Sequence, residues 1–375
     1  MDMTSERRRP DAAFWQRTRV LLTGHTGFKG SWLARMLARL GAEVHGLALD
    51  PTTTPAMFEV ARIPEVLHSD NRIDIRNGTA TAEAVRIIAP HIVLHLAAQP
   101  LVREGYRDPA GTFATNVAGT ANVLAAFHRT LPAPQPQAIV IVTSDKVYRQ
   151  VPEPDGEVMA HGETAALGGT DPYSSSKAMV EELVEVFRRL PAIDSTSAWD
   201  LPVATARAGN VIGGGDWSHD RLIPDCIDAF TEGRPVVLRY PAAVRPWQHV
   251  LEPLAGYLLL AEDLATRSSS TPSAVNFGPA DADGTGVTVR EIARAVARRW
   301  GVDQRLVVEN PSTEAPETGE LRVDSTLAMA SLNWQPRWST TDALARTVDW
   351  YQAQRDGQDM AVVTDQQIDE YFHAR

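Results

Sequence analysis

The sequence predicts an α/β protein built on a doubly wound parallel sheet, with a smaller lobe in the carboxyl-terminal part. Three observations favour this fold. Short, continuous apolar runs recur in the first half of the chain, amphipathic helical patterns separate them, and glycines directly follow the first run. Continuous apolar strands are typical of a parallel sheet covered on both faces, and their alternation with helices requires right-handed crossovers. The sheet is therefore expected to be of the Rossmann type.

The first βαβ unit lies near the amino end. Residues 18–23 (TRVLLT) form a short apolar run, and residues 31–40 (SWLARMLARL) carry apolar side chains at helical spacing. Gly41 ends that helix in the way glycine commonly does, and residues 43–50 (EVHGLALD) predict a second strand. Strand, turn, helix and strand thus follow one another as a βαβ unit requires.

Further strands and helices continue the alternation. Residues 92–98 (IVLHLAA) and 138–143 (AIVIVT) are apolar runs of strand length, while residues 116–130 and 176–189 have the apolar spacing of helices. These segments extend the sheet and its two helical layers.

The character of the chain changes at about Ala208. Three glycines at 213–215, several prolines and shorter apolar stretches indicate loops and small elements, with amphipathic helices predicted at 287–300 and 342–354. Residues after Gly357 stay unassigned. The predicted organisation is a tail at 1–17, a Rossmann domain at 18–207, and a second lobe at 208–375 from which about 247–280 return to the Rossmann domain.

The composition is that of an ordinary globular protein. Of the 375 residues, 43% are hydrophobic and 22% are charged, which provides enough apolar surface for a large core. The net charge of -11 argues against broad electrostatic binding to nucleic acid or to an anionic membrane. Cys226 is the only cysteine, and no apolar run approaches the roughly 20 residues that span a bilayer. Because no signal-peptide pattern precedes Thr18, we expect a cytoplasmic protein, and we predict no metal site.

The glycines after the first strand predict a dinucleotide site. Gly24, Gly27 and Gly30 stand between a strand and a helix, where absent side chains let backbone N–H groups approach a pyrophosphate at the helix amino end. The spacing GxxGxxG has one residue more than the GxGxxG fingerprint. By itself it is also compatible with an ordinary strand-to-helix turn.

Acidic residues at strand ends indicate where adenosine would lie. Asp50 ends the second strand, where a carboxylate would accept hydrogen bonds from the ribose and repel the extra phosphate of NADP, and no arginine follows that strand closely. This favours NAD. The alternative is a solvated aspartate that starts the turn at Pro51. Asp74 and Ile75 follow another candidate strand and could face the adenine, or Asp74 could only cap a loop.

A catalytic group is predicted where a buried strand meets a helix. Tyr173 and Lys177 are four residues apart on a helix, so both side chains share one face, and a nearby ammonium favours the phenolate that would take a hydroxyl proton. Ser144, Asp145 and Lys146 follow the apolar run at 138–143, at the sheet edge where ligands collect. Asp145 as an acid, Lys146 as a base and Ser144 as a hydrogen-bond donor would suit an elimination. The alternative without a catalytic role is a polar strand end and an ordinary surface Tyr/Lys pair.

These segments together resemble the extended short-chain dehydrogenase/reductase family, and the resemblance covers nearly the whole chain. Within that family the similarity is to the branch that dehydrates CDP-glucose, in which aspartate is followed by lysine rather than by glutamate. The segments that carry it are GHTGFKGSWL from Gly24, AAQPLVR from Ala97, TSDKVY from Thr143, DPYSSSK from Asp171, RAGNVIGGGDW from Arg207 and RPWQHVLEPL from Arg245.

The resemblance implies a role for each matching residue. Ser144 and Tyr173 would bind the sugar 4-hydroxyl, Asp145 would protonate the departing 6-hydroxyl, and Lys146 would act at carbon 5. Lys177 would support the tyrosine and the cofactor, NAD. Beyond the residues already named, the implied cofactor positions are Thr26, Phe28, Lys29, Ala97, Ala98, Gln99 and Asn116. The implied substrate positions, besides Ser144, are Asn210 and Arg245, with Arg103, Arg221 and His249 as weaker candidates.

The implied reaction converts CDP-glucose to CDP-4-keto-6-deoxyglucose through oxidation at carbon 4, loss of water and return of hydride to carbon 6. The resemblance also implies that residues 18–207 bind NAD, that the second lobe mainly binds substrate, and that two chains pair through the helices at 116–130 and 176–189. The alternatives are a dehydratase or 4-epimerase for another nucleotide sugar and, as a different class, a dinucleotide sensor without catalysis.

Overall fold

The computed structural model describes residues 7–127, 135–150, 160–193, 201–266, 271–279, 287–310 and 321–374. A seven-stranded sheet forms the centre of the molecule, in the order β11-β6-β5-β4-β1-β2-β3, and every neighbouring pair is parallel. The fold class predicted from the sequence is thereby confirmed. The strands are β1 (Arg19–Thr23), β2 (Glu43–Ala48), β3 (Ser69–Arg72), β4 (Ile92–His95), β5 (Ala138–Val142), β6 (Val203–Ala208) and β11 (Ala274–Phe277).

The apolar runs are continuous because both faces of the sheet are buried. In β1, Val20 and Leu22 belong to the hydrophobic core on one face, whereas Leu21 belongs to the core on the other. In β4, Leu94 and Val93 divide between the two faces in the same way. Since side chains alternate along a strand, a strand buried on both faces has no polar positions to interrupt the run.

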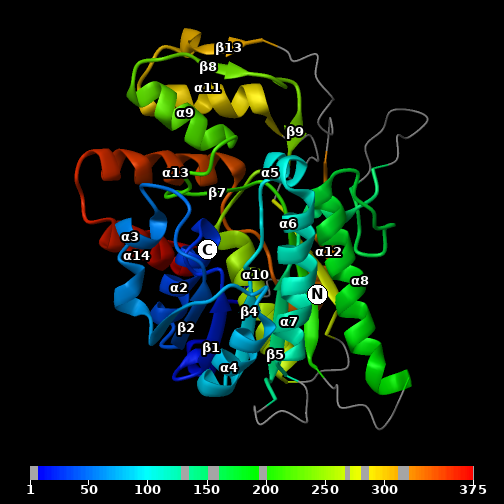
Figure 1. The fold of residues 1–375 in the computed structure, drawn as a ribbon. Coiled ribbons are helices and arrows are strands. Elements are labelled where there is room, and N and C mark those ends of the chain that lie inside the picture. The colour runs from blue at the N-terminus through cyan, green and yellow to red at the C-terminus, as the bar shows by residue number, and fades with distance from the viewer. Residues whose placement is uncertain are drawn as a thin grey trace, which may run out of the picture.

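Helices cover both faces of the sheet (Figure 1). One layer contains α2 (Phe28–Arg39), α10 (Leu251–Ala265), α12 (Thr326–Leu332) and α14 (Met360–His373). The other contains α4 (Gly78–Ile88), α5 (Val102–Arg107), α6 (Pro109–Phe113), α7 (Gly119–Ala125) and α8 (Pro172–Ile193), with a π-helical turn at Ala114–Ala118. Residues 128–130 of the helix predicted at 116–130 lie outside the described residues. Among the described helices, none is long and apolar enough to cross a membrane.

The smaller lobe lies beyond one end of the sheet (Figure 1). Its helix α11 starts with a capping box at Thr288 and ends at Gly301, which has the left-handed conformation that glycine adopts without strain. The elements of the lobe and of its junction with the sheet are β7 (Val211–Ile212), α9 (Leu222–Thr231), β8 (Val236–Leu238), β9 (Val244–Arg245), β10 (Gln248–His249), β12 (Val287–Thr288), α11 (Val289–Trp300), β13 (Val307–Glu309) and α13 (Thr340–Arg355). The short helix α3 (Met57–Val60) follows β2.

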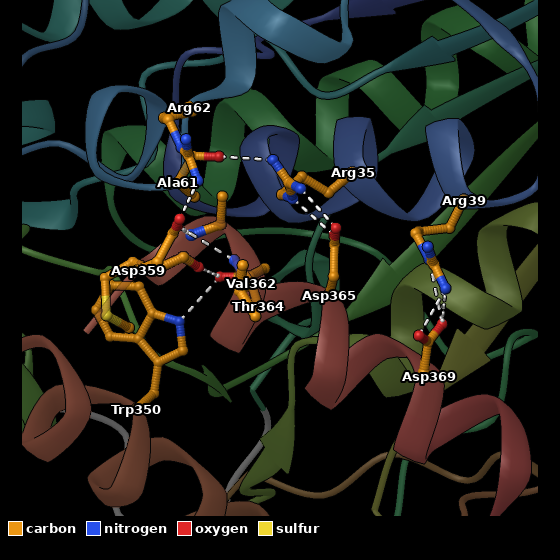
Figure 2. A network of polar contacts seen from close by, with 12 residues as sticks. Arg35, Arg39, Ala61, Arg62, Trp350, Asp359, Val362, Thr364, Asp365 and Asp369 are labelled. Carbon is orange, nitrogen blue, oxygen red and sulfur yellow. Dashed lines mark hydrogen bonds and ion pairs between the residues drawn. The ribbon is translucent and has the colours of Figure 1, made fainter.

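The chain after Gly357, which the sequence leaves unassigned, forms α14, which packs on α13 and on α2. Figure 2 shows the contacts: Arg35 donates two hydrogen bonds to Asp365, at 2.7 and 2.6 Å, and Arg39 pairs with Asp369 at 2.6 Å. Each partner lies some 330 positions away in the chain. Residues 208–375 are therefore divided between the lobe and the layers of the sheet.

The prediction of an amino-terminal tail is wrong for residues 7–17. Trp15, at the end of α1 (Ala12–Trp15), is fully buried, and its indole N–H donates to Glu262 of α10 at 2.8 Å. Arg8 pairs with Glu262 at 2.9 Å and with Asp263 at 2.7 Å. A single buried tryptophan with long-range polar contacts fixes a segment that composition alone predicts to be free. Residues 1–6 lie outside the described residues.

Candidate active site

The glycine turn joins β1 to α2 at the carboxyl edge of the sheet. Gly24 has φ +76°, and a Cβ added there would lie 2.7 Å from the backbone nitrogen of Ala97. A Cβ on Gly30 would lie 2.1 Å from the carbonyl oxygen of Gly24. Neither position admits a side chain, because backbone atoms leave no room. The turn therefore packs tightly against the loop after β4 and against the first turn of α2.

The amino end of α2 fits an anionic ligand. Gly27 is the N-cap residue, and no described side chain caps the helix there. The Thr26 hydroxyl donates to the carbonyl of Leu49 at 2.9 Å, and Phe28 packs on the hydrophobic core. The first N–H groups of the helix are thus left without a side-chain acceptor, in the arrangement that binds a pyrophosphate. The residues present fit a dinucleotide.

Asn116 links the loop after β4 to α8. Its side-chain oxygen accepts from the Gln99 N–H at 2.8 Å, and its amide donates to the Ser176 hydroxyl at 2.8 Å. The residue is buried in the π-helical turn. Asn116 also donates to the carbonyl of Gln99 at 3.2 Å, so it holds the backbone of Gln99 from both sides.

At the end of β2, where the sequence predicts the adenosine ribose, the structure corrects one expectation. The Asp50 side chain is 86% exposed and directed to the solvent edge, but Arg72 of β3 lies beside it, 3.6 Å away. No arginine is near Asp50 in the chain, yet one is near it in space. Asp74 pairs with Arg76 at 2.6 Å, and the Ile75 side chain is buried against Gly119.

The predicted catalytic residues come together between β5 and α8. Ser144 follows β5, and its hydroxyl donates to Asp145 at 2.9 Å. Tyr173 is the second residue of α8, whose start is fixed by the carboxylate of Asp171, which accepts from the Tyr173 N–H at 2.9 Å. A hydrogen bond joins the side chains of Tyr173 and Ser144. Lys146 stands next to them in a short 3₁₀ turn (Asp145–Val147) and is partly exposed.

Asp145 is enclosed and has one free oxygen. The residue is 2% exposed, and its Oδ2 atom has no hydrogen-bond partner among the described residues. A Cβ on Gly209 would lie 1.7 Å from that atom, so only glycine fits at the end of β6. A buried carboxyl oxygen without a partner is costly unless a ligand or a proton satisfies it. The atom is placed to serve a bound group.

The electrostatics of Tyr173 differ from the prediction. Burial raises the pKa of the Tyr173 phenol, while its interaction with Ser144 and the charge of Arg221 lower it. Lys177 instead donates to the carbonyl of Val142 at 2.9 Å. Burial lowers the pKa of Lys177 to about 8, against the effect of Glu181, one helical turn further on. Arg221 thus supplies the cationic influence on the phenol that the sequence assigns to Lys177.

Two polar groups near this site were missed from the sequence. Tyr257 of α10 accepts a hydrogen bond from Lys29 at 3.4 Å, and its pKa is raised by burial and also by Tyr173 and Asp145. His161 stacks on Tyr148 and interacts electrostatically with Asp145. Tyr257 carries the only hydroxyl in residues 251–260 (LEPLAGYLLL), a mostly apolar run that otherwise indicates a core helix. That hydroxyl was the signal available in the sequence.

The side chain of Lys29, in the first turn of α2, lies close enough to the catalytic group to interact with its charges. Burial and the charges of Arg221 and Lys177 together lower the pKa of its ammonium to about 7, against the effect of Asp145. Four residues from four separate parts of the chain therefore share one electrostatic environment. The amino end of α2 and the catalytic group belong to a single site.

Two predicted substrate residues lie at this site. Asn210 directly follows Gly209 and has φ +40°. Arg221 precedes α9, and its charge acts on both Tyr173 and Lys29. These residues bring the first part of the lobe to the carboxyl edge of the sheet.

The other three predicted substrate residues are placed differently. Arg103 of α5 pairs with Asp220 at 2.9 Å, next to Arg221. Arg245 is buried and donates to the carbonyl of Val244 at 2.8 Å. His249 is fully buried between Trp32 and Trp338, where burial lowers its pKa to about 3, and its Nε2 atom has no hydrogen-bond partner among the described residues. The ring therefore packs in the core, and its contact with a substrate stays a prediction.

A buried ion pair between β6 and α8 fixes the elements that carry the catalytic group. Arg207 of β6 donates to both carboxylate oxygens of Glu181, at 3.0 and 2.8 Å, and both side chains are 4% exposed. Thr143 and Thr205 also donate to Glu181. The hydroxyl of Tyr148 accepts from Arg207 at 2.8 Å. Strands β5 and β6 and helix α8 are thereby fixed together beneath Ser144 and Lys177.

The fold and this site define a class of enzyme. Its members bind a dinucleotide on a Rossmann sheet and carry a Ser/Tyr/Lys group at the carboxyl edge of that sheet. Comparison with known proteins gives the family. The model of the "NAD dependent epimerase/dehydratase family" matches residues 20–278. The chain belongs to this family, and NAD is its cofactor.

Individual relatives agree with this family. The chain is 40% identical over 367 residues to a CDP-glucose 4,6-dehydratase of Salmonella typhimurium, which covers 97% of this chain and 99% of the relative. It is 25% identical over 345 residues to a UDP-glucose 4-epimerase of Mycoplasma pneumoniae, covering 89% and 97%. A solved dTDP-glucose 4,6-dehydratase of Streptomyces venezuelae with NAD bound superposes with a TM-score of 0.74 at 24% identity, over 92% of this chain and 100% of that one.

Proposed function

We propose that this protein dehydrates CDP-glucose to CDP-4-keto-6-deoxyglucose. The observation that carries the proposal is the buried Asp145, whose Oδ2 atom has no hydrogen-bond partner among the described residues. Asp145 contacts Ser144, which interacts with Tyr173, and Lys146 is the next residue in the chain. An acid and a base next to an oxidation site suit the loss of water, which an epimerase does not require. The likeness to the Salmonella enzyme, at 40% identity, supports CDP as the nucleotide.

The first step is oxidation at carbon 4. NAD, when bound, accepts the carbon 4 hydrogen and later returns it to carbon 6. Tyr173 takes the proton of the 4-hydroxyl, and Ser144 donates a hydrogen bond that fixes the hydroxyl. The charge of Arg221 lowers the pKa of Tyr173 against the effect of burial. The pKa of the phenol is raised overall, so the charge of Arg221 offsets only part of the effect of burial.

The second step is the loss of water from carbons 5 and 6. A ketone at carbon 4 makes the carbon 5 proton acidic, and Lys146 takes that proton or stabilises the enolate by its charge. Asp145 gives its proton to the departing 6-hydroxyl. Its burial against Gly209 holds the carboxyl in one position and keeps bulk water from competing for it.

The arginines of the site bind the anionic part of the substrate. Arg221 and Asn210 lie at the catalytic group, and we assign them to the diphosphate and the sugar nucleotide. Arg103, which pairs with the neighbouring Asp220, and Arg245, on the lobe side, complete the nucleotide site. Guanidinium groups suit phosphate oxygens because they donate two parallel hydrogen bonds.

We also propose that two chains pair through α7 and α8. Helix α8 carries Met179 and Val186, both more than half exposed at 51% and 54%. Apolar side chains of this size on one helix are typical of a surface that another chain covers. Light scattering of the purified protein distinguishes a dimer from a monomer.

CDP-glucose labelled with deuterium at carbon 4 tests the reaction. We expect a 6-deoxy product with the label at carbon 6 and no net consumption of NAD. UDP-, GDP- and deoxythymidine-diphospho-glucose serve as competing substrates. Preference for one of these would overturn the CDP assignment alone, whereas label retained at carbon 4 in a product that keeps its 6-hydroxyl would overturn the dehydratase.

Variants at Asp145 and Lys146 separate oxidation from elimination. Asp145→Asn and Lys146→Ala should slow water loss by about 10²-fold or more, while slowing the oxidation of carbon 4 much less. Rapid mixing with CDP-glucose should therefore show an accumulating nicotinamide absorbance in both variants. Loss of that first signal, with unchanged later steps, would show that the two residues only position the sugar.

A further inference from the structure

The segment 209–221 runs from the end of β6 to the start of α9, and both of its ends lie at the catalytic group. It begins at Gly209, where a Cβ would overlap the Asp145 carboxylate, and it ends at Arg221, whose charge acts on the catalytic tyrosine. Asn210 is its second residue. Because the proposed function assigns Asn210 and Arg221 to the sugar nucleotide, we call this segment the substrate loop.

The middle of the substrate loop packs on α2. The indole N–H of Trp32, in the second turn of α2, donates to the carbonyl of Gly214 at 2.8 Å, and Trp32 is fully buried. A Cβ on Gly213 would lie only 3.1 Å from the Cζ atom of Phe28 and 2.9 Å from a methyl carbon of Val250. Two successive glycines thus allow the backbone of the loop to lie directly against the helix.

The opposite side of the substrate loop packs on α13. A Cβ on Gly214 would overlap the indole ring of Trp350, so no side chain fits there. The hydroxyl of Tyr351 donates to the carbonyl of Asp216 at 2.5 Å. The loop is therefore held between two helices, and the bond from Trp32 is the one that fixes it to α2.

This bond selects one position of the loop. It joins two buried groups, and a buried donor or acceptor that loses its partner is costly. A shift of the loop away from α2 would leave the indole N–H of Trp32 and the carbonyl of Gly214 unpaired. The bond therefore favours the position in which both ends of the loop lie at the catalytic group.

The helix that holds the substrate loop is also the helix that fits the cofactor. Phe28 is the first residue of α2 after the N-cap Gly27, and the N–H groups of this turn suit a pyrophosphate. Trp32 lies four residues further along, about one helical turn. A ligand that orders the first turn of α2 therefore also orders the surface on which the substrate loop packs.

We propose that Trp32 is a positioning residue for the sugar nucleotide: it holds the substrate loop on α2, and it thereby couples binding at Asn210 and Arg221 to occupancy of the cofactor site. The inference rests on the proposed function in taking these two residues as substrate contacts. It predicts that loss of the indole N–H weakens the binding of CDP and reduces the effect of NAD on that binding.

The test is titration calorimetry of the full chain, freed of bound nucleotide, with CDP in the absence and presence of saturating NAD. CDP lacks the sugar that would meet the nicotinamide, so an effect of NAD on its binding is carried by the protein. We expect NAD to tighten the binding of CDP to the unmodified chain. Trp32→Phe keeps an aromatic ring and removes the N–H, and should weaken CDP binding to the NAD-bound chain by about three- to tenfold, as for one hydrogen bond.

Trp15→Phe is the matched control. Trp15 is also fully buried, and its indole N–H also donates at 2.8 Å, but to Glu262 and not to the substrate loop. This variant should lower the melting temperature at least as far as Trp32→Phe does, and should leave CDP binding unchanged. Gly214→Ala changes the same contact from the loop, because the added Cβ shifts the carbonyl that Trp32 holds, and should also weaken CDP binding.

The proposal is overturned if Trp32→Phe and Gly214→Ala bind CDP as the unmodified chain does, or if Trp15→Phe weakens CDP binding equally. It is also overturned if NAD tightens CDP binding by the same factor in Trp32→Phe and in the unmodified chain. If the unmodified chain binds NAD but no CDP, the nucleotide assignment of the proposed function fails instead, so the two failures are distinguishable.

Discussion

Replacing Tyr173 by phenylalanine should lower the turnover of CDP-glucose by about 10²- to 10⁴-fold, the range for loss of a general base. The ring of phenylalanine fills the same space at the start of α8, whereas the group that takes the 4-hydroxyl proton is lost. The hydrogen bond with Ser144 is lost with it. Because the oxidation of carbon 4 precedes every other step, the rate of NAD reduction in a single turnover should fall by the same factor.

Tyr106→Phe is the matched control. Tyr106 lies on α5, and the residue is 65% exposed, so removal of its hydroxyl should leave turnover unchanged. Single-turnover absorbance of the nicotinamide and the melting temperature are measured for both variants. Near-normal NAD reduction in a folded Tyr173→Phe protein would contradict the proposed base and point to another proton acceptor at carbon 4.

The central strands could be predicted because their chemistry is local. β1, β4 and β5 are buried on both faces, so each appears in the sequence as an uninterrupted apolar run. The residues directly after β5 could be predicted as a site for the same reason, since the carboxyl end of a buried strand has to meet the ligand edge. Ser144 and Tyr173 do meet there.

What could not be predicted depends on contacts between distant parts of the chain. β3 has the sequence SDNR and is not an apolar run, so the approach of Arg72 to Asp50 leaves no local signal. Trp15 is fully buried, and its indole N–H donates to Glu262, 247 positions away. His249 lies in a motif shared with a family, but its neighbours Trp32 and Trp338 make it a core residue. Motif membership does not distinguish contact with a ligand from support of the fold.

Arg207→Met should lower the free energy of unfolding by about 3–5 kcal/mol, the cost of removing one partner of a buried ion pair. The substitution leaves Glu181 with its charge in a site where both side chains are 4% exposed. The hydrogen bonds from Thr143 and Thr205 satisfy oxygen lone pairs but carry no compensating charge. The fall is measured by denaturant unfolding with NAD absent, so that loss of cofactor does not contribute.

Arg86→Met provides the comparison, because Arg86 pairs with Glu83 on the surface of α4, with side chains 47% and 54% exposed. Solvent screens exposed pairs strongly, so that variant should unfold almost as the parent does. Adding Glu181→Gln to Arg207→Met removes the stranded charge and should recover part of the loss. If Arg207→Met costs no more than Arg86→Met, or if the double variant recovers nothing, the penalty is not electrostatic, and the network beneath Ser144 and Lys177 stabilises the protein by packing alone.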